Sequence, residues 1–453
     1  DSEVRFIAFH EVQERILEIN DPFSRTLQSL ELYSYVQQIS GDYCNWNTAK
    51  FILLAACIPS LLEIRAGYDA EALKTLKQHM SIDFALTKSV QQMIQQLANS
   101  HDRTHVYWLP VFIDAALLHG LDLLANSRKY TLLDTPVKVL NDLDRAIIVA
   151  GASGQRLEWI YKVRDKVESS FSLLLPGPRP PDTALTSVTP NLPQLAFPVQ
   201  SYKAGDMDLG RFHSMIRDTS CSVPFVIKGA ISFWPALTTR KWADLEYLRS
   251  AVGHHRLVPV ELGAKYTDRN WSQQLMPFGE YLDQAIYPLQ NNRAGGTGYL
   301  AQHNLFAQAP RLKRDFWLPD YTQVETGRRA VPEDSATAND GVLVNAWLGP
   351  KGTVSPLHFD KYDNLFAQVV GYKHMRFYAP SESRNVYPFP PGSSLCNTSQ
   401  VDVNEPDLQR FARFSQARYL EVCMGPGDLL YMPPRWWHYV RSLSTSVSIS
   451  MWF

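Results

Sequence analysis

The sequence predicts an α+β protein in which an all-helical amino-terminal domain precedes a carboxy-terminal barrel of short strands. Three observations lead to this prediction. Apolar residues recur at helical intervals over roughly the first 170 residues. A proline-rich stretch then interrupts the chain, and beyond it short apolar segments alternate with turn residues, as strands do. Because 453 residues are many for one hydrophobic core, we expect two domains.

The helical domain is expected to occupy residues 1–175. Apolar positions in residues 49–67 cluster at intervals of three and four, and Gly67 suits the end of that helix because glycine readily adopts the left-handed conformation found there. The same pattern recurs in residues 89–99, 106–126 and 158–175. Successive helices joined by short polar turns predict a helical bundle or an α-solenoid, although we find no defensible 34-residue repeat.

Residues 176–198 form the predicted linker. They contain seven of the chain's 29 prolines within 23 positions. Proline fixes φ and removes a backbone donor, so this stretch is expected to be extended and semi-rigid. The second domain is therefore expected to span residues 199–453.

The second domain is predicted to be rich in short strands. They are expected within residues 223–231, 256–262, 298–306, 341–349, 364–380, 427–434, 436–443 and 445–453. Alternation is clearest in the last segment, where serines alternate with Val447, Ile449 and Met451. Many short strands bounded by turn residues predict a barrel or a jelly roll, with a few helices, such as one within residues 241–251, outside it.

Composition excludes several classes of function. A net charge of −1 and a pI near 6.9 provide no bulk field for phosphates, so we expect no direct nucleic-acid binding. No apolar run approaches the roughly 18 residues of a membrane span, and the amino terminus resembles an amphipathic helix and not a signal peptide. Five scattered cysteines without a CxxC pair argue against a disulfide framework or a zinc knuckle and favour a reducing compartment.

His358 and Asp360 are candidate metal ligands. Only His358, of 12 histidines, has an acidic residue two positions further on, which is about the chance frequency, so the pair needs a third ligand. Residues i and i+2 of a strand share a face, so both side chains would point into the barrel while Phe359 faces the opposite layer. An Fe(II) oxygenase requires two histidines and one carboxylate. His438, the only histidine after His374, is predicted to supply the third ligand from another strand, although alone it could equally be a core histidine.

Lys373 is predicted to lie in a strand after Gly371. A buried ammonium is costly unless it is paired, and the distal carboxylate of a metal-chelating 2-oxo acid would pair with it. Tyr299, Ser355 and Asn364 could complete the hydrogen bonds to that acid. The spacing is equally compatible with a lysine that ends a hairpin in solvent.

The segments SPLHFD, NLFAQVVGYKHMRFYAP, NTSQVDV, GPGDLLYMPPRWWHYVRSL and SVSISMWF resemble the Jumonji-C (JmjC) branch of the Fe(II)- and 2-oxoglutarate-dependent oxygenases. The resemblance runs from Pro198 to the end of the chain. It implies a double-stranded β-helix of the cupin-like jelly-roll type, with O2 as co-substrate. It further implies Fe(II) held by His358, Asp360 and His438, and 2-oxoglutarate contacted by Tyr299, Ser355, Asn364 and Lys373. Phe359 departs from the pattern, since a polar residue is expected there.

The resemblance leaves the substrate open between two reactions. A methylated ammonium is usually held by an aromatic cage, whereas a guanidinium favours carboxylates flanked by flat rings. Glu261, Trp271 and Trp347 occupy the positions where similar proteins bind substrate, and Glu261 suits a guanidinium. Taken alone, Glu261 reads as a surface strand residue and the tryptophans as core residues. Hydroxylation of arginine side chains in proteins is the main expectation, and histone methyl-lysine demethylation with the same cofactors is the alternative.

Two other classes of function stay open. The barrel could be a non-catalytic binding module, with the helical domain recruiting a protein partner, although a complete ligand triad argues against this. A zinc-dependent hydrolase is weaker, because no general-base carboxylate accompanies the triad at a recognisable spacing. The implied partner is a protein or histone tail in chromatin, and the implied location is the nucleus, with the cytoplasm second.

Overall fold

The computed structural model divides the chain into two compact units, residues 1–177 and 178–453. The described residues are 134–149, 151–171, 190–218, 222–263, 265–267, 271–287, 298–326, 338–339 and 341–453, with isolated positions at 185 and between 113 and 124. The helices expected within residues 49–67 and 89–99, and most of 106–126, lie outside these residues. The domain boundaries drawn at residues 175 and 198 stay predictions.

Two helices are described in the first unit. They are α8 (Asp134–Ile148) and α9 (Gly154–Ser170), and α9 overlaps the helix expected at residues 158–175. In α8, Val139, Leu143 and Ala146 recur at intervals of three and four and are fully buried. No helix among the described residues has both the length and the apolar character needed to cross a membrane.

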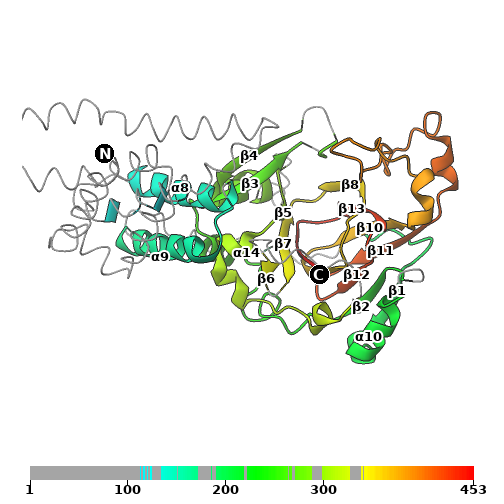
Figure 1. The fold of residues 1–453 in the computed structure, drawn as a ribbon, viewed down its shortest axis with the longest axis horizontal. Helices are drawn as coiled ribbons and strands as arrows, with labels where there is room; N and C mark the ends of the chain where they lie inside the picture. The colour runs from blue at the N-terminus through cyan, green and yellow to red at the C-terminus, as the bar shows by residue number, and fades with distance from the viewer. Residues whose placement is uncertain are drawn as a thin grey trace, which may run out of the picture. The chain divides into compact units, whose positions relative to one another are not determined.

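The second unit contains two sheets (Figure 1). The larger sheet has the order β1-β2-β12-β9-β14-β7-β5-β3-β4, with β6 paired to β7, and the smaller has the order β11-β10-β13-β8. The strands are β1 (Gln200–Lys203), β2 (Phe225–Lys228), β3 (Leu257–Leu262), β4 (Ser272–Pro277), β5 (Gly298–His303), β6 (Ala338–Asn339), β7 (Val342–Gly349), β8 (Val354–His358), β9 (Asn364–Val370), β10 (Lys373–Tyr378), β11 (Tyr419–Met424), β12 (Leu429–Met432), β13 (Trp437–Ser442) and β14 (Ser446–Trp452). The predicted α+β class is confirmed, whereas β1, β4, β6 and β11 were not among the predicted strands.

Both faces of β14 are buried, and both of its edges are paired, one with β7 and the other with β9. Val447, Ile449 and Met451 belong to the main hydrophobic core. On the opposite face, Ser448 donates a hydrogen bond to the Gln368 amide oxygen, and Ser450 accepts one from the Trp347 indole. The alternation in the sequence therefore separates an apolar layer from a polar layer, and not a buried face from solvent.

Short helices lie between and beside the strands of the second unit. They are α10 (Leu209–Ile216), α11 (Leu245–Val252), α12 (Phe278–Tyr281) with the following π-helix η4 (Leu282–Ile286), α14 (Leu305–Gln308), and the 3-10 helices η3 (Ala204–Asp206), η5 (Pro310–Arg314), η6 (Asp320–Gln323), η7 (Pro380–Arg384) and η8 (Ala412–Gln416). α11 matches the helix expected within residues 241–251, and it begins at Leu245 because the Asp244 side chain caps it by accepting from the amides of Glu246 and Tyr247.

The last residues of the predicted linker are attached to the edge of the smaller sheet. The Ala196 amide donates to the Glu421 carboxylate, and the Glu421 amide donates to the Phe197 carbonyl. The Val199 amide in turn donates to the Glu421 carbonyl at 2.9 Å. Residues 196–199 therefore pair with the edge of β11 through a short parallel bridge.

Candidate metal centre and cosubstrate pocket

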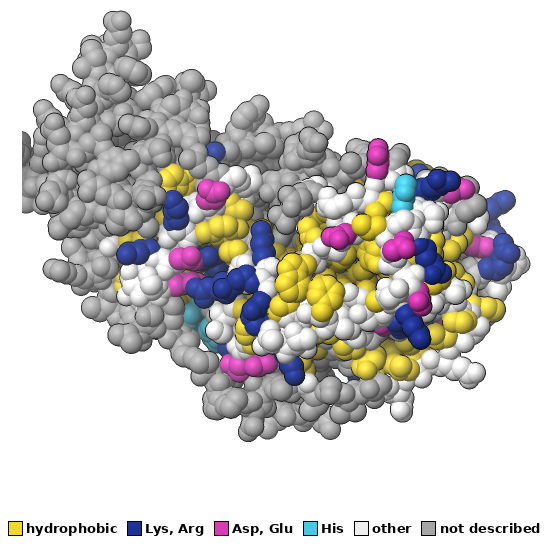
Figure 2. Space-filling view, turned by 90° about the horizontal axis from the view of Figure 1, so that it is seen from below, with side chains coloured by type: hydrophobic (Ala, Val, Ile, Leu, Met, Phe, Trp, Pro, Cys, Tyr) yellow, Lys and Arg dark blue, Asp and Glu magenta, His cyan; other side chains and the backbone are white. Residues whose placement is uncertain are grey.

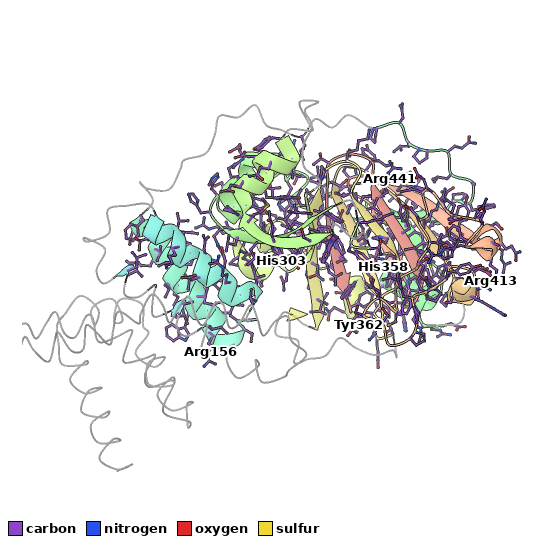
Figure 3. All side chains as sticks on the ribbon, turned by 90° about the horizontal axis from the view of Figure 1, so that it is seen from above. Arg156, His303, His358, Tyr362, Arg413 and Arg441 are labelled. Carbon is purple, nitrogen blue, oxygen red and sulfur yellow. The ribbon has the colours of Figure 1, made fainter. Side chains whose placement is uncertain are left out.

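His358 and His438 lie directly opposite each other on neighbouring antiparallel strands, β8 and β13. Their ring centroids are 4.3 Å apart, and His358 lies among the strands of the barrel (Figure 3). Asp360 Oδ2 lies 3.6 Å from His438 Nε2. One ligand atom from each of the three residues lies within 4.8 Å of the others. The three residues predicted from the sequence as metal ligands therefore meet at one point.

Asp360 lies in the segment that follows β8, and not within the strand as expected. β8 ends at His358, so the expectation that Asp360 shares its strand is wrong. The chain beyond β8 is held instead by neighbouring segments, since the Phe359 amide donates to the Asn397 carbonyl and the Arg435 amide donates to the Asp360 carbonyl. The Phe359 ring packs edge to face against Trp437, with centroids 4.9 Å apart.

Hydrogen bonds fix the orientation of both imidazoles. His358 Nδ1 lies 2.7 Å from the Pro356 carbonyl, and His438 Nδ1 lies 3.0 Å from the Trp436 carbonyl. A proton donated from Nδ1 leaves the Nε2 lone pair available for a metal. Burial lowers the pKa of His438 to about 4, and the neighbouring His358 acts in the same direction. At neutral pH His438 is therefore in the uncharged form that binds metal, and the group fits a facial triad of two histidines and one carboxylate.

A cavity of about 490 Å³ opens beside this group. Of the predicted site residues, its lining includes Glu261, Tyr299, Trp347, Ser355, His358 and Asp360. Lys373, Asn364 and His438 are buried, with exposed fractions of 1%, 4% and 5%, and are not part of the lining. Trp271 is not part of the lining either.

Lys373 is buried inside the barrel, which excludes the solvent-exposed alternative. Its ammonium donates a 3.3 Å hydrogen bond to the Tyr299 hydroxyl and lies over the rings of Phe366, Tyr299 and Trp347 at 5.1, 5.7 and 5.9 Å. In the part of the chain that the structure describes, no carboxylate pairs with it. Burial therefore lowers the pKa of Lys373 to about 7.

The other three residues predicted to bind the cosubstrate, Tyr299, Ser355 and Asn364, are also buried. Burial raises the pKa of Tyr299, an effect opposed by its hydrogen bond with Ser355. The Oδ1 atom of Asn364 is buried and has no hydrogen-bond partner among the described residues. Buried charged groups normally have partners, so the uncompensated Lys373 ammonium indicates a place for an anionic ligand. The donor set therefore fits a carboxylate-bearing cosubstrate.

Glu261 lies at the end of β3, where it is paired with Tyr299 on β5. Burial raises the pKa of Glu261, and the adjacent Trp271 indole partly opposes this effect. Trp347 packs against Tyr299, with ring centroids 6.0 Å apart, and so belongs to the wall around Lys373.

Several further residues line the same cavity and were not predicted from the sequence. They are Tyr266, Gln302, Tyr362, Trp452 and the segment from Ser394 to Thr398. Gln302 has a φ of 46°, a conformation that is uncommon outside glycine and often marks functional sites. No sequence motif signals this conformation, which occurs where the pairing register between β5 and β7 shifts, between Leu300 and His303.

The cupin-like domain family model matches residues 217–453, slightly more than half of the chain. The chain therefore belongs to the cupin-like domain family, and within it to the JmjC proteins.

Its relatives include lysine-specific demethylase 8 from Xenopus tropicalis, which is 46% identical over 230 residues, or 51% of this chain and 48% of the relative. Jumonji C domain-containing protein 5 from Drosophila melanogaster is 37% identical over 280 residues, covering 61% of this chain and 64% of the relative. The human bifunctional peptidase and (3S)-lysyl hydroxylase JMJD7 is 29% identical over 264 residues, covering 52% of this chain and 79% of the relative. The matched region spans about half to two thirds of the length of the first two relatives.

Proposed function

We propose that this chain is an Fe(II)- and 2-oxoglutarate-dependent oxygenase that hydroxylates arginine side chains of protein substrates. One observation carries the proposal: a single cavity is lined by Glu261, by two residues of the His358–Asp360–His438 group, and by Tyr299, whose hydroxyl accepts a hydrogen bond from the buried Lys373. Bound iron with 2-oxoglutarate would supply the activation of O2 that inserts oxygen into an unreactive C–H bond.

The residues of the chain would bind and orient the reactants. His358, Asp360 and His438 would hold the metal on one side and leave its opposite face open. Lys373 and the Tyr299 hydroxyl would bind the distal carboxylate of 2-oxoglutarate, because a charge-assisted hydrogen bond there compensates the burial of the ammonium. Ser355 and Asn364 would complete the hydrogen bonds to the cosubstrate. The aromatic walls would limit access of water to the reacting atoms.

The acidic wall of the cavity favours arginine over methyl-lysine. A guanidinium offers five donors in a planar fork that matches a carboxylate, and Glu261 provides such a carboxylate beside the rings of Tyr266 and Trp347. One relative is named as a lysine-specific demethylase and another as a lysyl hydroxylase, so histone methyl-lysine demethylation is the second candidate. The aromatic lining of the cavity is the observation that favours it.

Mass spectrometry separates the two candidates. The protein would be incubated with Fe(II), ascorbate, 2-oxoglutarate and peptides that carry arginine or trimethyl-lysine, and succinate would be measured in parallel. A gain of one oxygen on arginine supports hydroxylation, whereas loss of a methyl group from lysine supports demethylation. If neither peptide nor a wider set of nuclear protein extracts is modified and no succinate forms, the barrel is a binding module and the proposal fails.

A further inference from the structure

One wall of the cavity is formed by two segments that are far apart in the sequence. The first is the turn after β3, which contains Lys265 and Tyr266, and the second is the loop that runs through Thr398 to Asp402. The Lys265 ammonium forms an ion pair with the Asp402 carboxylate. The Tyr266 hydroxyl lies 3.3 Å from the Thr398 hydroxyl. We call these two contacts together the loop clamp.

The loop clamp is connected to the strand that carries a metal-binding histidine. Thr398 forms a β-bridge with His358. On either side of this bridge, the Ser399 amide donates to the Leu357 carbonyl at 2.7 Å, and the Phe359 amide donates to the Asn397 carbonyl at 3.0 Å. The second segment is therefore fixed to β8 by backbone hydrogen bonds. The loop clamp then joins the turn that carries Tyr266 to this second segment.

Of the two contacts in the loop clamp, the hydroxyl pair lies in the cavity wall and the ion pair lies outside it. Tyr266 and Thr398 line the cavity, but Lys265 is not part of the lining and neither is Asp402. The side chains of Lys265 and Asp402 are 26% and 35% exposed, so their ion pair lies at the rim, partly in solvent. The ion pair cannot touch a group reacting at the metal, but it can hold the turn that places Tyr266 there.

We infer that Lys265 and Asp402 are positioning residues that hold the Tyr266 wall closed around the side chain of a protein substrate. The identity of that substrate rests on the proposed function, but the mechanical connection does not. His358, His438 and Lys373 lie on β8, β13 and β10, which stay paired without the loop clamp, and Asp360 lies two residues beyond β8. Loss of the ion pair therefore weakens the binding of the protein substrate and leaves metal and 2-oxoglutarate binding unchanged.

Charge exchange tests the ion pair without relying on catalysis. Lys265→Asp places two carboxylates together, Asp402→Lys places two ammonium groups together, and the double variant restores the attraction with reversed signs. Hydrogen exchange would be followed by mass spectrometry on the full chain with Mn(II) and 2-oxoglutarate. We expect exchange in the peptides that cover residues 263–267 to be at least about threefold faster in each single variant and to return to the wild-type rate in the double variant. Lys313→Asp, on the exposed face of η5, is the matched control, and exchange in the peptides that cover residues 263–267 should equal that of wild type.

A second measurement tests the positioning role. With the arginine peptide, each single variant should raise KM about three- to tenfold, while kcat and the affinities for Mn(II) and 2-oxoglutarate stay within about twofold of wild type. The double variant should recover the wild-type KM. Unchanged exchange in both single variants overturns the inference, as does an unchanged KM with faster exchange, or a matching loss of Mn(II) affinity. If the wild-type chain does not turn over the peptide, the proposed function fails and the exchange result alone decides the inference.

Discussion

Lys373 and Tyr299 meet inside the barrel through one 3.3 Å hydrogen bond, and in the described residues this is the polar contact that the buried ammonium makes. A buried cation without a carboxylate destabilises a folded protein, because desolvation is not compensated by an ion pair. Such an arrangement is expected where a ligand supplies the missing charge. Lys373 is therefore expected to lower the free energy of unfolding of the barrel while serving its proposed activity, and two predictions depend on this.

Lys373→Met should stabilise the cosubstrate-free protein and remove 2-oxoglutarate binding. Methionine has a similar length and requires no partner, so we expect the free energy of unfolding to rise by about 1–3 kcal/mol and the 2-oxoglutarate requirement to increase by about 100-fold or more. Thermal unfolding and a titration of succinate formation measure the two effects. Lys313→Met, at an exposed position, should change neither. A destabilised Lys373→Met variant with normal 2-oxoglutarate affinity would contradict the assignment and point to Arg376 or Arg441 as the counter-ion.

The same lysine predicts how stability depends on pH. Its pKa is about 7 in the folded protein and near 10.4 when unfolded, so between these values the unfolded state binds more protons. The destabilisation is fully present below about pH 7 and is relieved as pH rises towards about 10. We therefore expect the stability of wild type, relative to Lys373→Met, to increase over this range by up to about 1.4 kcal/mol per pH unit. Chemical denaturation of both proteins at several pH values measures this difference, and parallel curves would refute the prediction.

The proposed metal ligands give a third prediction. His358→Ala and Asp360→Ala should each lower Mn(II) affinity by about 100-fold or more and abolish succinate formation, because two ligands do not hold the ion against water. Both side chains border the cavity, so thermal unfolding without metal should change little. Metal titration by electron paramagnetic resonance measures the affinity. His213→Ala, on the exposed face of α10, is the control and should bind metal normally. Normal activity with full metal loading in either ligand variant would refute the assignment.

The fourth prediction concerns Gly371, where the barrel leaves no space for a side chain. Its φ is 70°, and a Cβ there would lie 1.9 Å from the Thr445 carbonyl oxygen. Gly371→Ala should therefore lower the free energy of unfolding by about 3 kcal/mol or more, and should displace Lys373 two residues further on. Gly392 also has a positive φ, 91°, but apart from its chain neighbours nothing lies within 4 Å of its Cβ position, so Gly392→Ala should lower the free energy of unfolding by only about 1 kcal/mol. If both variants lose the same free energy of unfolding, the positive φ, and not the lack of space, makes glycine necessary at residue 371.

The sequence indicated much of the site because its chemistry is local in the chain. His358 and Asp360 are two residues apart, so their spacing could be tested against a strand, and the segments around Lys373 and His438 resemble those of known oxygenases. Apolar alternation likewise predicted β14 and most of the other strands, because alternation reflects the pleat of a single strand. It missed β11, whose residues Tyr419–Met424 include Glu421. Glu421 is buried by contacts from distant segments, namely His374, Arg376 and Ala196.

Taken alone, the sequence determined the fold class, the proline-rich break and the residue types of the candidate metal group, since each depends on neighbours along the chain. Only the tertiary structure decided that Asp360 lies beyond β8, that Lys373 is buried without a carboxylate among the described residues, and that Lys265 meets Asp402. Those properties depend on which distant segments pack together. Burial, desolvation and ion pairing are energies of contact in space, and linear spacing does not encode them.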